Sequence, residues 1–151
     1  MPTNPFRIVK VDTSHAEVAS SIIKMHGKCF PDLEFQQLHG DWWIAYSRDT
    51  KAPVAFAGLW PSIRLANVGY LCRSGVLPEG RGKGLQRKLI KVREREAKKK
   101  RWIALHSDTA PGNAHSLNNL FACGFRAFVP TDPWCGEEWN YVRKILEDGV
   151  A

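Results

Sequence analysis

Short apolar runs separated by polar turns dominate the first half of the chain, a pattern typical of β-strands. Four of these runs predict strands: Phe6–Val11, Trp42–Tyr46, Val54–Trp60 and Val68–Leu77. The polar segment Arg48–Lys51 predicts a hairpin turn between the second and third strands, and Ser62–Asn67 predicts a turn before the fourth. The last three of these strands can therefore pair antiparallel.

One helix is predicted between the first two strands. Its apolar residues recur every three to four positions, as one helix face requires: Val18, Ile22, Met25 and Cys29. Thr13 and Ser14 offer an N-cap, and Pro31 is expected to end the helix. The segment Leu33–Leu38, which follows, is predicted to be irregular or a short helix.

The pattern changes after residue 77. A glycine-rich turn, Pro78–Gly84, is followed by apolar residues at helical spacing, namely Leu85, Leu89 and Val92. The run Trp102–His106 then predicts another strand. A strand, helix and strand in this order typically form a parallel pair with a right-handed crossover.

The last third of the chain completes an α/β pattern. A second helix is predicted over Asn113–Cys123 with Gly124 ending it, and two more strands over Phe125–Val129 and Trp139–Ile145. Strands first and alternation afterwards predict an α/β fold with a mixed, mostly antiparallel central sheet flanked by helices. A chain of 151 residues has the length of one domain, so we expect residues 1–151 to form a single one.

Composition excludes several classes of protein. The chain is 44% hydrophobic and 25% charged, and its apolar runs are far shorter than the roughly 20 residues needed to cross a bilayer. The N-terminus lacks the pattern of a secretory signal, so the expected location is the cytoplasm. The cysteines lack metal-site spacing and are expected to be free thiols, with no bound metal: Cys29, Cys72, Cys123 and Cys135.

The chain is basic, and the excess is concentrated in one segment. Lys and Arg number 22 against 15 Asp and Glu, a net charge of +7, which favours an anionic ligand or partner. The segment Arg87–Arg101 holds nine Lys or Arg and two Glu. Such a run fits either the solvated face of a helix or a nucleic-acid-binding patch, and the sequence leaves both open.

The glycine-rich turn is the strongest candidate for chemistry. Gly80, Gly82 and Gly84 stand between a strand and a helix, with Arg81 and Lys83 interleaved. Backbone amides bare of side chains at a helix N-terminus form a phosphate cradle. The order of the glycines does not match the dinucleotide fingerprint G-x-G-x-x-G, and no G-K-[ST] follows.

The same segment closely resembles the acetyl-CoA-binding motif of the GNAT superfamily of N-acetyltransferases, [QR]-x-x-G-x-[GA]. Arg81, Gly84 and Gln86 occupy its three defined positions, although Gln86 departs from the usual small residue. Downstream, Asn113–Phe125 resembles the second signature of that superfamily. In that signature an Asn is followed three residues on by a small residue and eleven on by Gly-Phe.

The resemblance implies a GNAT-like fold and acetyl-CoA as the cosubstrate. Pantetheine would pair with the exposed edge of the strand before the glycine-rich turn, and the amide near Val76 would hold the thioester oxygen. Gly75 suits a bulge there, or else it only relieves crowded packing. The implied cofactor-binding residues are Ser74, Gly75, Val76, Arg81, Gly82, Lys83, Gly84, Leu85, Gln86, Asn113 and Ser116.

The catalytic side chains depart from the family pattern. The position that often carries a proton-donating Tyr holds Leu120, so water, Ser116 or Tyr141 would have to protonate the leaving thiolate. For the base that deprotonates the amine, His106 is the first candidate and Asp108 the second. The alternative is that His106 simply forms a hydrogen bond at the end of the sheet.

Other aromatic and acidic residues have two interpretations. Family topology would bring five tryptophans toward the acceptor cleft, where they could contact an apolar or cationic substrate, although each could equally fill the core: Trp42, Trp43, Trp60, Trp134 and Trp139. Acidic pairs that could steer an ammonium group are Asp32 with Glu34 and Glu137 with Glu138. The histidines without a partner pattern are expected at the surface: His15, His26 and His39.

The function implied is an acyltransferase that moves the acetyl group of acetyl-CoA directly to a primary amine. The acceptor could be a small molecule, a protein amine or an aminoacyl-tRNA. The alternative is a non-catalytic CoA-binding or nucleic-acid-binding module on the same fold, with nucleic acid held through Arg87–Arg101. No membrane partner is expected, and a dimer is compatible with the sequence.

Overall fold

The computed structural model describes residues 4–35 and 37–146, and its backbone forms two compact units. The first consists of Met1–Trp60 and Cys72–Leu89, and the second of Pro61–Leu71 and Ile90–Ala151. Two elements have several residues in each unit, β4 (Val68–Val76) and α2 (Leu85–Lys99), and the last residue of a third, Pro61 of β3 (Pro53–Pro61), belongs to the second unit. Each unit is described below by itself.

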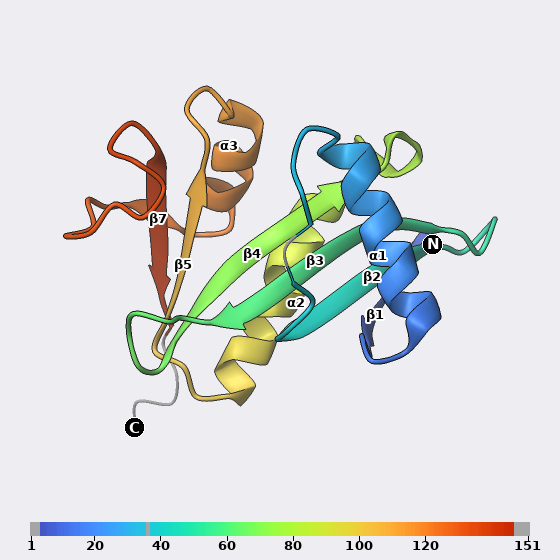
Figure 1. The fold of residues 1–151 in the computed structure, drawn as a ribbon, viewed down its shortest axis with the longest axis horizontal. Helices are drawn as coiled ribbons and strands as arrows, with labels where there is room; N and C mark the ends of the chain where they lie inside the picture. The colour runs from blue at the N-terminus through green and yellow to red at the C-terminus, as the bar shows by residue number, and fades with distance from the viewer. Residues whose placement is uncertain (1–3, 36, 147–151) are drawn as a thin grey trace. The chain divides into compact units, whose positions relative to one another are not determined.

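The first unit contains an antiparallel meander covered by a helix. Its strands are β1 (Phe6–Val11), β2 (Asp41–Ser47), β3 (Pro53–Pro61) and the end of β4. Phe6 pairs with Ser47 and Trp42 with Gly58, so β1–β2 and β2–β3 are antiparallel and the predicted hairpin is confirmed. Helix α1 (Ala16–Cys29) crosses the face of β2 and β3 that Figure 1 turns toward the viewer.

Large apolar side chains fill the core of this unit. Trp42, Ile44 and Phe56 on the strands and Ile22 on α1 are at most 1% exposed. Two glycines permit this density. A Cβ at Gly58 would lie 2.5 Å from Cys72 Sγ and one at Gly75 would lie 2.7 Å from Cys29 Sγ, closer than atoms can pack. The close contact at Gly75 supports the second of the two roles that the sequence allowed, and the bulge at this position stays a prediction.

The second unit is built on a parallel pair. Its elements are the start of β4, the rest of α2, β5 (Ala104–Thr109), α3 (Ala114–Ala122), β6 (Arg126–Ala127) and β7 (Asn140–Ile145). Val68 pairs with Ala104 and Tyr70 with His106, so β4 and β5 are parallel, as the strand–helix–strand pattern predicted. Figure 1 shows β5 and β7 side by side, and this pair is antiparallel.

Across the sheet the strands follow the order β1-β2-β3-β4-β5-β7-β6. This is the mixed, mostly antiparallel sheet with flanking helices that the sequence predicted, and that prediction is confirmed. The single domain over residues 1–151 stays a prediction, since the backbone forms two units.

Several element ends differ from the predicted ones for identifiable reasons. The N-cap of α1 is His15, because the Ser14 hydroxyl donates to Asp12 Oδ1 over 2.7 Å and does not bond the helix. Strand β5 begins at Ala104 because the amide of Trp102 still donates to Ala97 of α2. Strand β6 begins at Arg126, one residue later than predicted, because the amide of Phe125 donates back to Leu120 of α3.

Buried polar groups also correct one prediction. His15 and His39 are exposed as expected, but His26 is 1% exposed, so its surface placement was wrong. Its ring lies among three aromatic rings, with centroids 5.0 Å from Phe30, 4.9 Å from Phe35 and 6.1 Å from Phe56. The helical spacing already pointed to this, because His26 lies four residues after Ile22 and next to Met25, both of which are buried on the same face of α1.

Two structural features are absent from the described part of the chain, a membrane-spanning helix and a metal-binding cluster. Across residues 4–35 and 37–146, no helix combines the length and apolar character that spanning a bilayer requires. The same residues contain no group of three His, Cys, Asp or Glu side chains arranged to hold a metal ion. All four cysteines are free thiols, as predicted.

Candidate functional site

The glycine-rich turn in the first unit exposes backbone amides at the start of a helix. A short 3-10 turn, η1 (Pro78–Gly80), leads to an open loop, and Gly84 accepts the first bond of α2 from the amide of Lys88 over 3.2 Å. Gly82 and Gly84 both have φ of +77° with open space where a Cβ would be, so their conformation is what calls for glycine.

The amides of this loop are free to bind a ligand. Within the described residues, the N–H groups of Gly82, Lys83 and Gly84 have no hydrogen-bond acceptor. Arg81, Lys83 and both glycines are exposed, so the amides and two cations face solvent at a helix N-terminus. Free amides, a helix dipole and positive side chains together favour an anionic group such as a phosphate.

The predicted motif residues fasten this loop to the strand that it leaves. Arg81 Nε donates to the carbonyl oxygen of Val76 over 3.0 Å. Ser74 Oγ donates to Gln86 Oε1 over 3.4 Å, which connects β4 to the first turn of α2. The departure at Gln86 therefore has a structural reason, since a small residue could not make this contact. Leu85, also predicted for cofactor binding, is 2% exposed, and its side chain belongs to the core.

The parallel ladder between β4 and β5 is short. It comprises three residue pairs and ends at Tyr70 with His106, although β4 continues to Val76. Ser74, Gly75 and Val76 therefore stand outside that ladder. The expectation that this part of β4 offers backbone groups to a cosubstrate stays a prediction.

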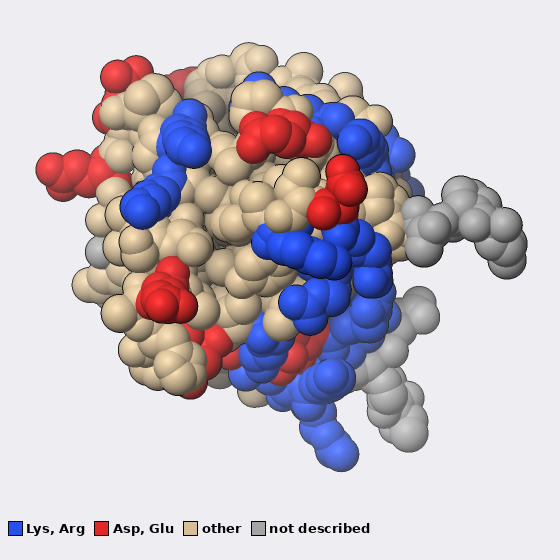
Figure 2. Space-filling model, turned by 90° about the vertical axis from the view of Figure 1, so that its right-hand side faces the viewer, with Lys and Arg blue, Asp and Glu red and all other residues tan. Residues whose placement is uncertain are grey.

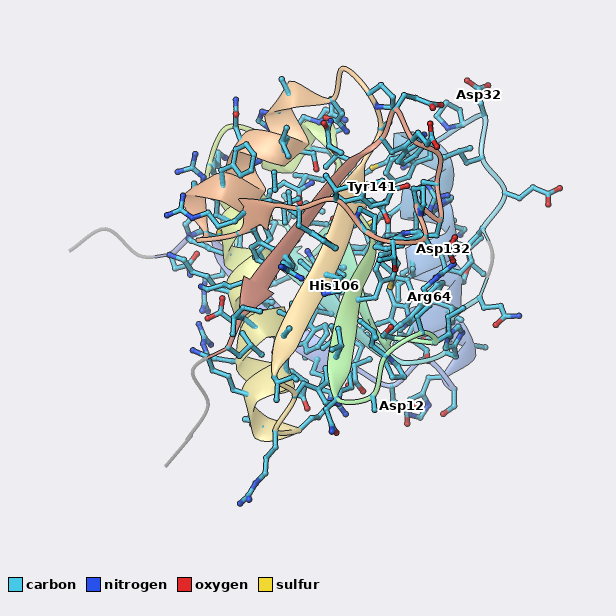
Figure 3. The ribbon with its side chains drawn as sticks, turned by 90° about the vertical axis from the view of Figure 1, so that its left-hand side faces the viewer. Asp12, Asp32, Arg64, His106, Asp132 and Tyr141 are labelled. Atoms are coloured by element: carbon cyan, nitrogen blue, oxygen red, sulfur yellow. The ribbon has the colours of Figure 1, made fainter. Side chains whose placement is uncertain are left out.

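In the second unit, polar and aromatic side chains gather on one face of β5. His106 and Asp108 are two residues apart and so project to the same face. The neighbouring strands place Tyr70 and Arg143 opposite His106, and Tyr141 opposite Asp108. Figure 3 labels His106 on β5 and Tyr141 on β7.

Asp108 is held by two aromatic donors. The Tyr70 hydroxyl donates to Asp108 Oδ2 over 2.6 Å, and the Trp134 indole N–H donates to the same oxygen over 2.8 Å. Hydrogen bonds to a carboxylate are stronger than those between neutral groups, so the two donors fix its position. The second candidate base is thus a firmly positioned group on β5.

His106 occupies an aromatic environment beside a cation. It is half-buried, with its ring stacked on Trp134 at a centroid distance of 6.4 Å and an interplanar angle of 6°, and with Phe128 at 4.9 Å. Burial, and then the positive charge of Arg143, lower the pKa of His106 below its usual value. The imidazole is therefore neutral at pH 7 and can accept a proton.

Trp134 anchors the loop between β6 and β7 over this face. The Arg64 guanidinium lies 5.2 Å from its ring centroid and also pairs with Asp132 over 3.4 Å, as Figure 3 allows the reader to follow. Tyr141 lies edge-on to Trp134 at 4.6 Å. The interpretation of Trp134 as a residue near the predicted chemistry of β5 is consistent with these contacts.

Tyr141, one of the alternative proton donors, already uses its hydroxyl. It accepts a hydrogen bond from the amide of Cys135 and donates to the carbonyl of Gly136, both over 2.8 Å. Burial raises the pKa of this phenol above its ordinary value. A proton engaged in this way and held more tightly than usual suits fixing the loop better than donation to a leaving group.

The second signature forms the start of α3. Asn113 is the N-cap, and its Oδ1 accepts from the amide of Ser116 over 3.2 Å. Leu120, at the position where a phenol is often found, is 4% exposed, whereas Phe121 is 41% exposed. The cofactor-binding roles of Asn113 and Ser116 stay predictions, with a capping role for Asn113 beside them.

Sequence reasoning did not identify Tyr70 as part of this arrangement. Tyr70 entered only as a poor base, and Trp134 only as one of five tryptophans. One signal was available, because Tyr70, His106 and Asp108 occupy positions of predicted parallel strands. The register that brings Tyr70 opposite His106 was not available from sequence.

Comparison with known proteins finds one matching family and several similar solved structures. Residues 13–125 match the description "Acetyltransferase (GNAT) family". The structure is similar to that of the NatC complex bound to Gag peptide and CoA, with a TM-score of 0.76, 16% identity, and coverage of 95% of this chain and 99% of that one. No curated protein sequence matches the chain.

Two bacterial structures are similar over most of both chains. YncA from Salmonella typhimurium, solved with its cofactor acetyl-CoA, has a TM-score of 0.71 and 15% identity, covering 98% of each chain. The ribosomal-protein-S18-alanine N-acetyltransferase from Escherichia coli has a TM-score of 0.69 and 16% identity, covering 91% of this chain and 92% of that one. Identities this low establish a shared fold.

Proposed function

Because the chain belongs to the acetyltransferase (GNAT) family, as the match over residues 13–125 shows, we propose that it transfers the acetyl group of acetyl-CoA directly to a primary amine. The observation that carries the proposal is the exposed glycine-rich loop. Three free amides at Gly82, Lys83 and Gly84 stand at the start of α2, with Arg81 and Lys83 exposed beside them. This donor set fits the pyrophosphate of CoA.

The cosubstrate supplies an acetyl group activated as a thioester, and residues of β4 would align it. Ser74, Gly75 and Val76 lie outside the three-pair ladder with β5, which supports a role for their backbone groups in holding an extended ligand. The backbone of Val76 would then polarise the reacting carbonyl, as preorganised amides do in acyl transfer.

The amine must lose a proton before it attacks. His106 is neutral at pH 7, so it can take this proton, directly or through water. The amine nitrogen then forms a bond to the acetyl carbon, the carbon–sulfur bond breaks, the nitrogen releases its extra proton, and the leaving thiolate takes up a proton, so the products are the amide and the CoA thiol. No covalent intermediate with the enzyme is formed.

Departure of the thiolate lacks the usual phenol. Leu120 occupies that position, and Tyr141 is engaged with Cys135 and Gly136. Water or the Ser116 hydroxyl would have to supply the proton. Loss of a general acid slows such steps by something like 10²-fold and does not abolish them, so we expect a slow enzyme.

A non-catalytic module is the second candidate, and the basic helix α2 supports it. Its exposed cations are Arg87, Lys91, Arg95, Lys98 and Lys99. In Figure 2, the Lys and Arg side chains (blue) gather on the right-hand part of the face toward the viewer. The two acids of the segment are engaged with cations, Glu94 with Lys98 and Lys144, and Glu96 with Lys100. A polyanion such as nucleic acid could bind this surface.

One experiment separates the two candidates. Purified protein is mixed with acetyl-CoA and a panel comprising a small amine, a peptide with a free N-terminus and an aminoacyl-tRNA, and released CoA thiol is measured. Release that depends on an amine supports the enzyme. Tight CoA binding by calorimetry with no release for any amine would contradict the proposed transfer and favour the module.

A further inference from the structure

Asp108 is a partly buried carboxylate, and the residues that the structure describes supply it with no cation. Its Oδ2 accepts from Tyr70 and Trp134, and no bond to its Oδ1 exists among the described residues. No Lys, Arg or His of residues 4–35 and 37–146 forms an ion pair with it. Oδ1 is not among the described buried atoms that lack a partner, so this oxygen is open to solvent, and an open carboxylate oxygen with no cation beside it can accept an ammonium group from a ligand.

Three cations of the same unit make contacts elsewhere. Arg64 pairs with Asp132 and lies over Trp134 at 5.2 Å, and Arg143 lies over Phe128 at 4.7 Å. Lys144 bonds Glu94 over 2.7 Å. None of these three cations forms an ion pair with Asp108 Oδ1.

The groups around this carboxylate are aromatic. Tyr70 and Trp134 bond it directly, their rings meet edge to face with centroids 6.5 Å apart, and Tyr141 faces it across the β5–β7 ladder. The Trp134 ring already stacks against His106 and lies under the Arg64 guanidinium, so what the half-buried Tyr70 and Trp134 rings offer a ligand is apolar contact area. The combination fits an ammonium group on a flat apolar stem better than a compact metal ion, which would need further oxygen ligands.

We propose that Asp108 binds the ammonium group of the acceptor, and that the acceptor is a primary amine carried on an aromatic or flat apolar stem. This inference rests on the proposed acetyl transfer and names the substrate class for it. Tyr70 and Trp134 are positioning residues, because they hold Oδ2 and thereby direct Oδ1 toward the ligand. His106, on the same face two residues earlier, receives the proton.

The separate roles of Asp108 in binding and His106 in proton uptake predict different kinetic effects. An ion pair with Asp108 strengthens amine binding, but it also retains the proton that must leave before attack. Loss of the Asp108 charge should therefore weaken binding without slowing the chemical step, whereas loss of His106 should slow that step. The two residues are separable in KM and kcat.

The test uses 2-phenylethylamine as the probe, with n-butylamine for comparison, and the variants Asp108→Asn, Tyr70→Phe and Trp134→Phe. Binding is measured by calorimetry to protein saturated with CoA, which requires no turnover, and KM and kcat are measured by thiol release with acetyl-CoA. Asp49→Asn, which removes an exposed carboxylate from a turn, is the charge-matched control.

We expect Asp108→Asn to raise Kd and KM for 2-phenylethylamine at least about tenfold with kcat within about threefold, and Asp49→Asn to change neither. Tyr70→Phe and Trp134→Phe should each raise KM by about threefold, and they keep the test decisive if Asp108→Asn does not fold. An active enzyme whose Kd and KM are unchanged in these variants would overturn the inference. Asp108-dependent binding without turnover would support it while the proposed transfer fails.

Discussion

The Nε–H of Arg81 donates to the carbonyl oxygen of Val76 over 3.0 Å, so the glycine-rich loop is tied back to the strand that it leaves. The two residues are five positions apart in the chain, and the 3-10 turn Pro78–Gly80 lies between them. The tie holds the following amides of Gly82, Lys83 and Gly84 in one place, ready for an anion. A loop preorganised in this way loses less conformational entropy on binding.

Gly84→Val should abolish CoA binding. The residue has φ of +77°, which β-branched side chains avoid, and valine would also cover the amides that face the phosphates. We expect the Kd for CoA, measured by calorimetry, to rise at least about 100-fold, the equivalent of roughly 2.7 kcal/mol.

A matched control separates strain from ligand contact. Gly112→Val introduces the same residue at φ of +84°, also with nothing within 4 Å of the added Cβ, but outside the loop. Both variants should lose similar stability in urea, and only Gly84→Val should lose CoA. Unchanged affinity in a folded Gly84→Val protein would disprove the phosphate cradle.

Charge reversal on α2 tests the second candidate function. The test uses one triple variant that carries Lys98→Glu, Lys99→Glu and Lys100→Glu. Its rate of acetyl transfer to a small amine should stay within about twofold of the wild-type rate, because these side chains are exposed at and just beyond the end of α2. Helix stability should fall by about 1 kcal/mol, since cations at a helix C-terminus are favourable and anions are not.

The same variant reports on nucleic acid. If the basic surface binds RNA or DNA, the wild-type affinity falls steeply with salt, and the reversed protein has both a weaker affinity and a smaller salt slope. Titration of a labelled oligonucleotide at several salt concentrations measures both. Absence of binding by the wild-type protein would remove the nucleic-acid candidate.

Most of the fold could be predicted from periodicity because it depends on local pattern. Strand β1 was predicted with its observed bounds, Phe6–Val11, and the parallel pairing of β4 with β5 followed from the intervening helix. The errors lie where hydrogen bonds override pattern. Trp102 still bonds helix α2 and Phe125 bonds helix α3, so neither begins a strand.

The candidate site also has a part that could be predicted from local sequence and a part that could not. The glycine-rich loop is a continuous segment, so its conformation follows from the seven adjacent residues Pro78–Gly84. The Asp108 cluster is assembled from residues 38 and 26 positions away, Tyr70 and Trp134, and only strand register and loop closure bring them together. No pattern along the chain contains that information.

Buried His26 should make the protein less stable in acid. Burial, and then the charge of Arg73, lower its pKa, and its Nε2 has no hydrogen-bond partner. Below the usual histidine pKa of about 6.5 the unfolded chain binds a proton that the folded chain does not, so stability falls as pH falls. The slope should reach at most about 1.4 kcal/mol per pH unit for this group.

Urea unfolding at pH 7.5, 6.5 and 5.5 measures this slope. His26→Phe, which keeps an aromatic ring among Phe30, Phe35 and Phe56, should flatten it, whereas His115→Gln at an exposed position of α3 should not. The pKa of His106 is also lowered, so His106 is expected to account for the pH dependence of stability that remains in His26→Phe. An identical slope in His26→Phe and wild type would contradict this role.

His106→Ala should lower kcat and change the pH profile. Because burial and Arg143 lower the His106 pKa, its inflection is expected below pH 6.5, with the rate rising as pH rises through it. The charged groups facing it are Arg143 on β7 and Asp108 on β5, with Tyr70 opposite on β4. Removing the base should lower kcat by about 10²-fold and erase this inflection. A retained inflection would transfer the role of base to Asp108 acting through water.

Leu120→Tyr tests whether a missing phenol limits the rate. Leu120 is 4% exposed, so a larger ring is expected to lower stability by about 1–3 kcal/mol, and Leu120→Phe provides the same ring without the hydroxyl. If departure of the thiolate is limiting, kcat should be higher in Leu120→Tyr than in Leu120→Phe, by up to about 10²-fold. Single-turnover release of CoA thiol, measured on folded protein saturated with acetyl-CoA, compares the two directly. Equal rates in the two variants would show that a proton donor at this position is not what the reaction lacks, and a loss of rate in Ser116→Ala would then identify the Ser116 hydroxyl as the group that serves instead.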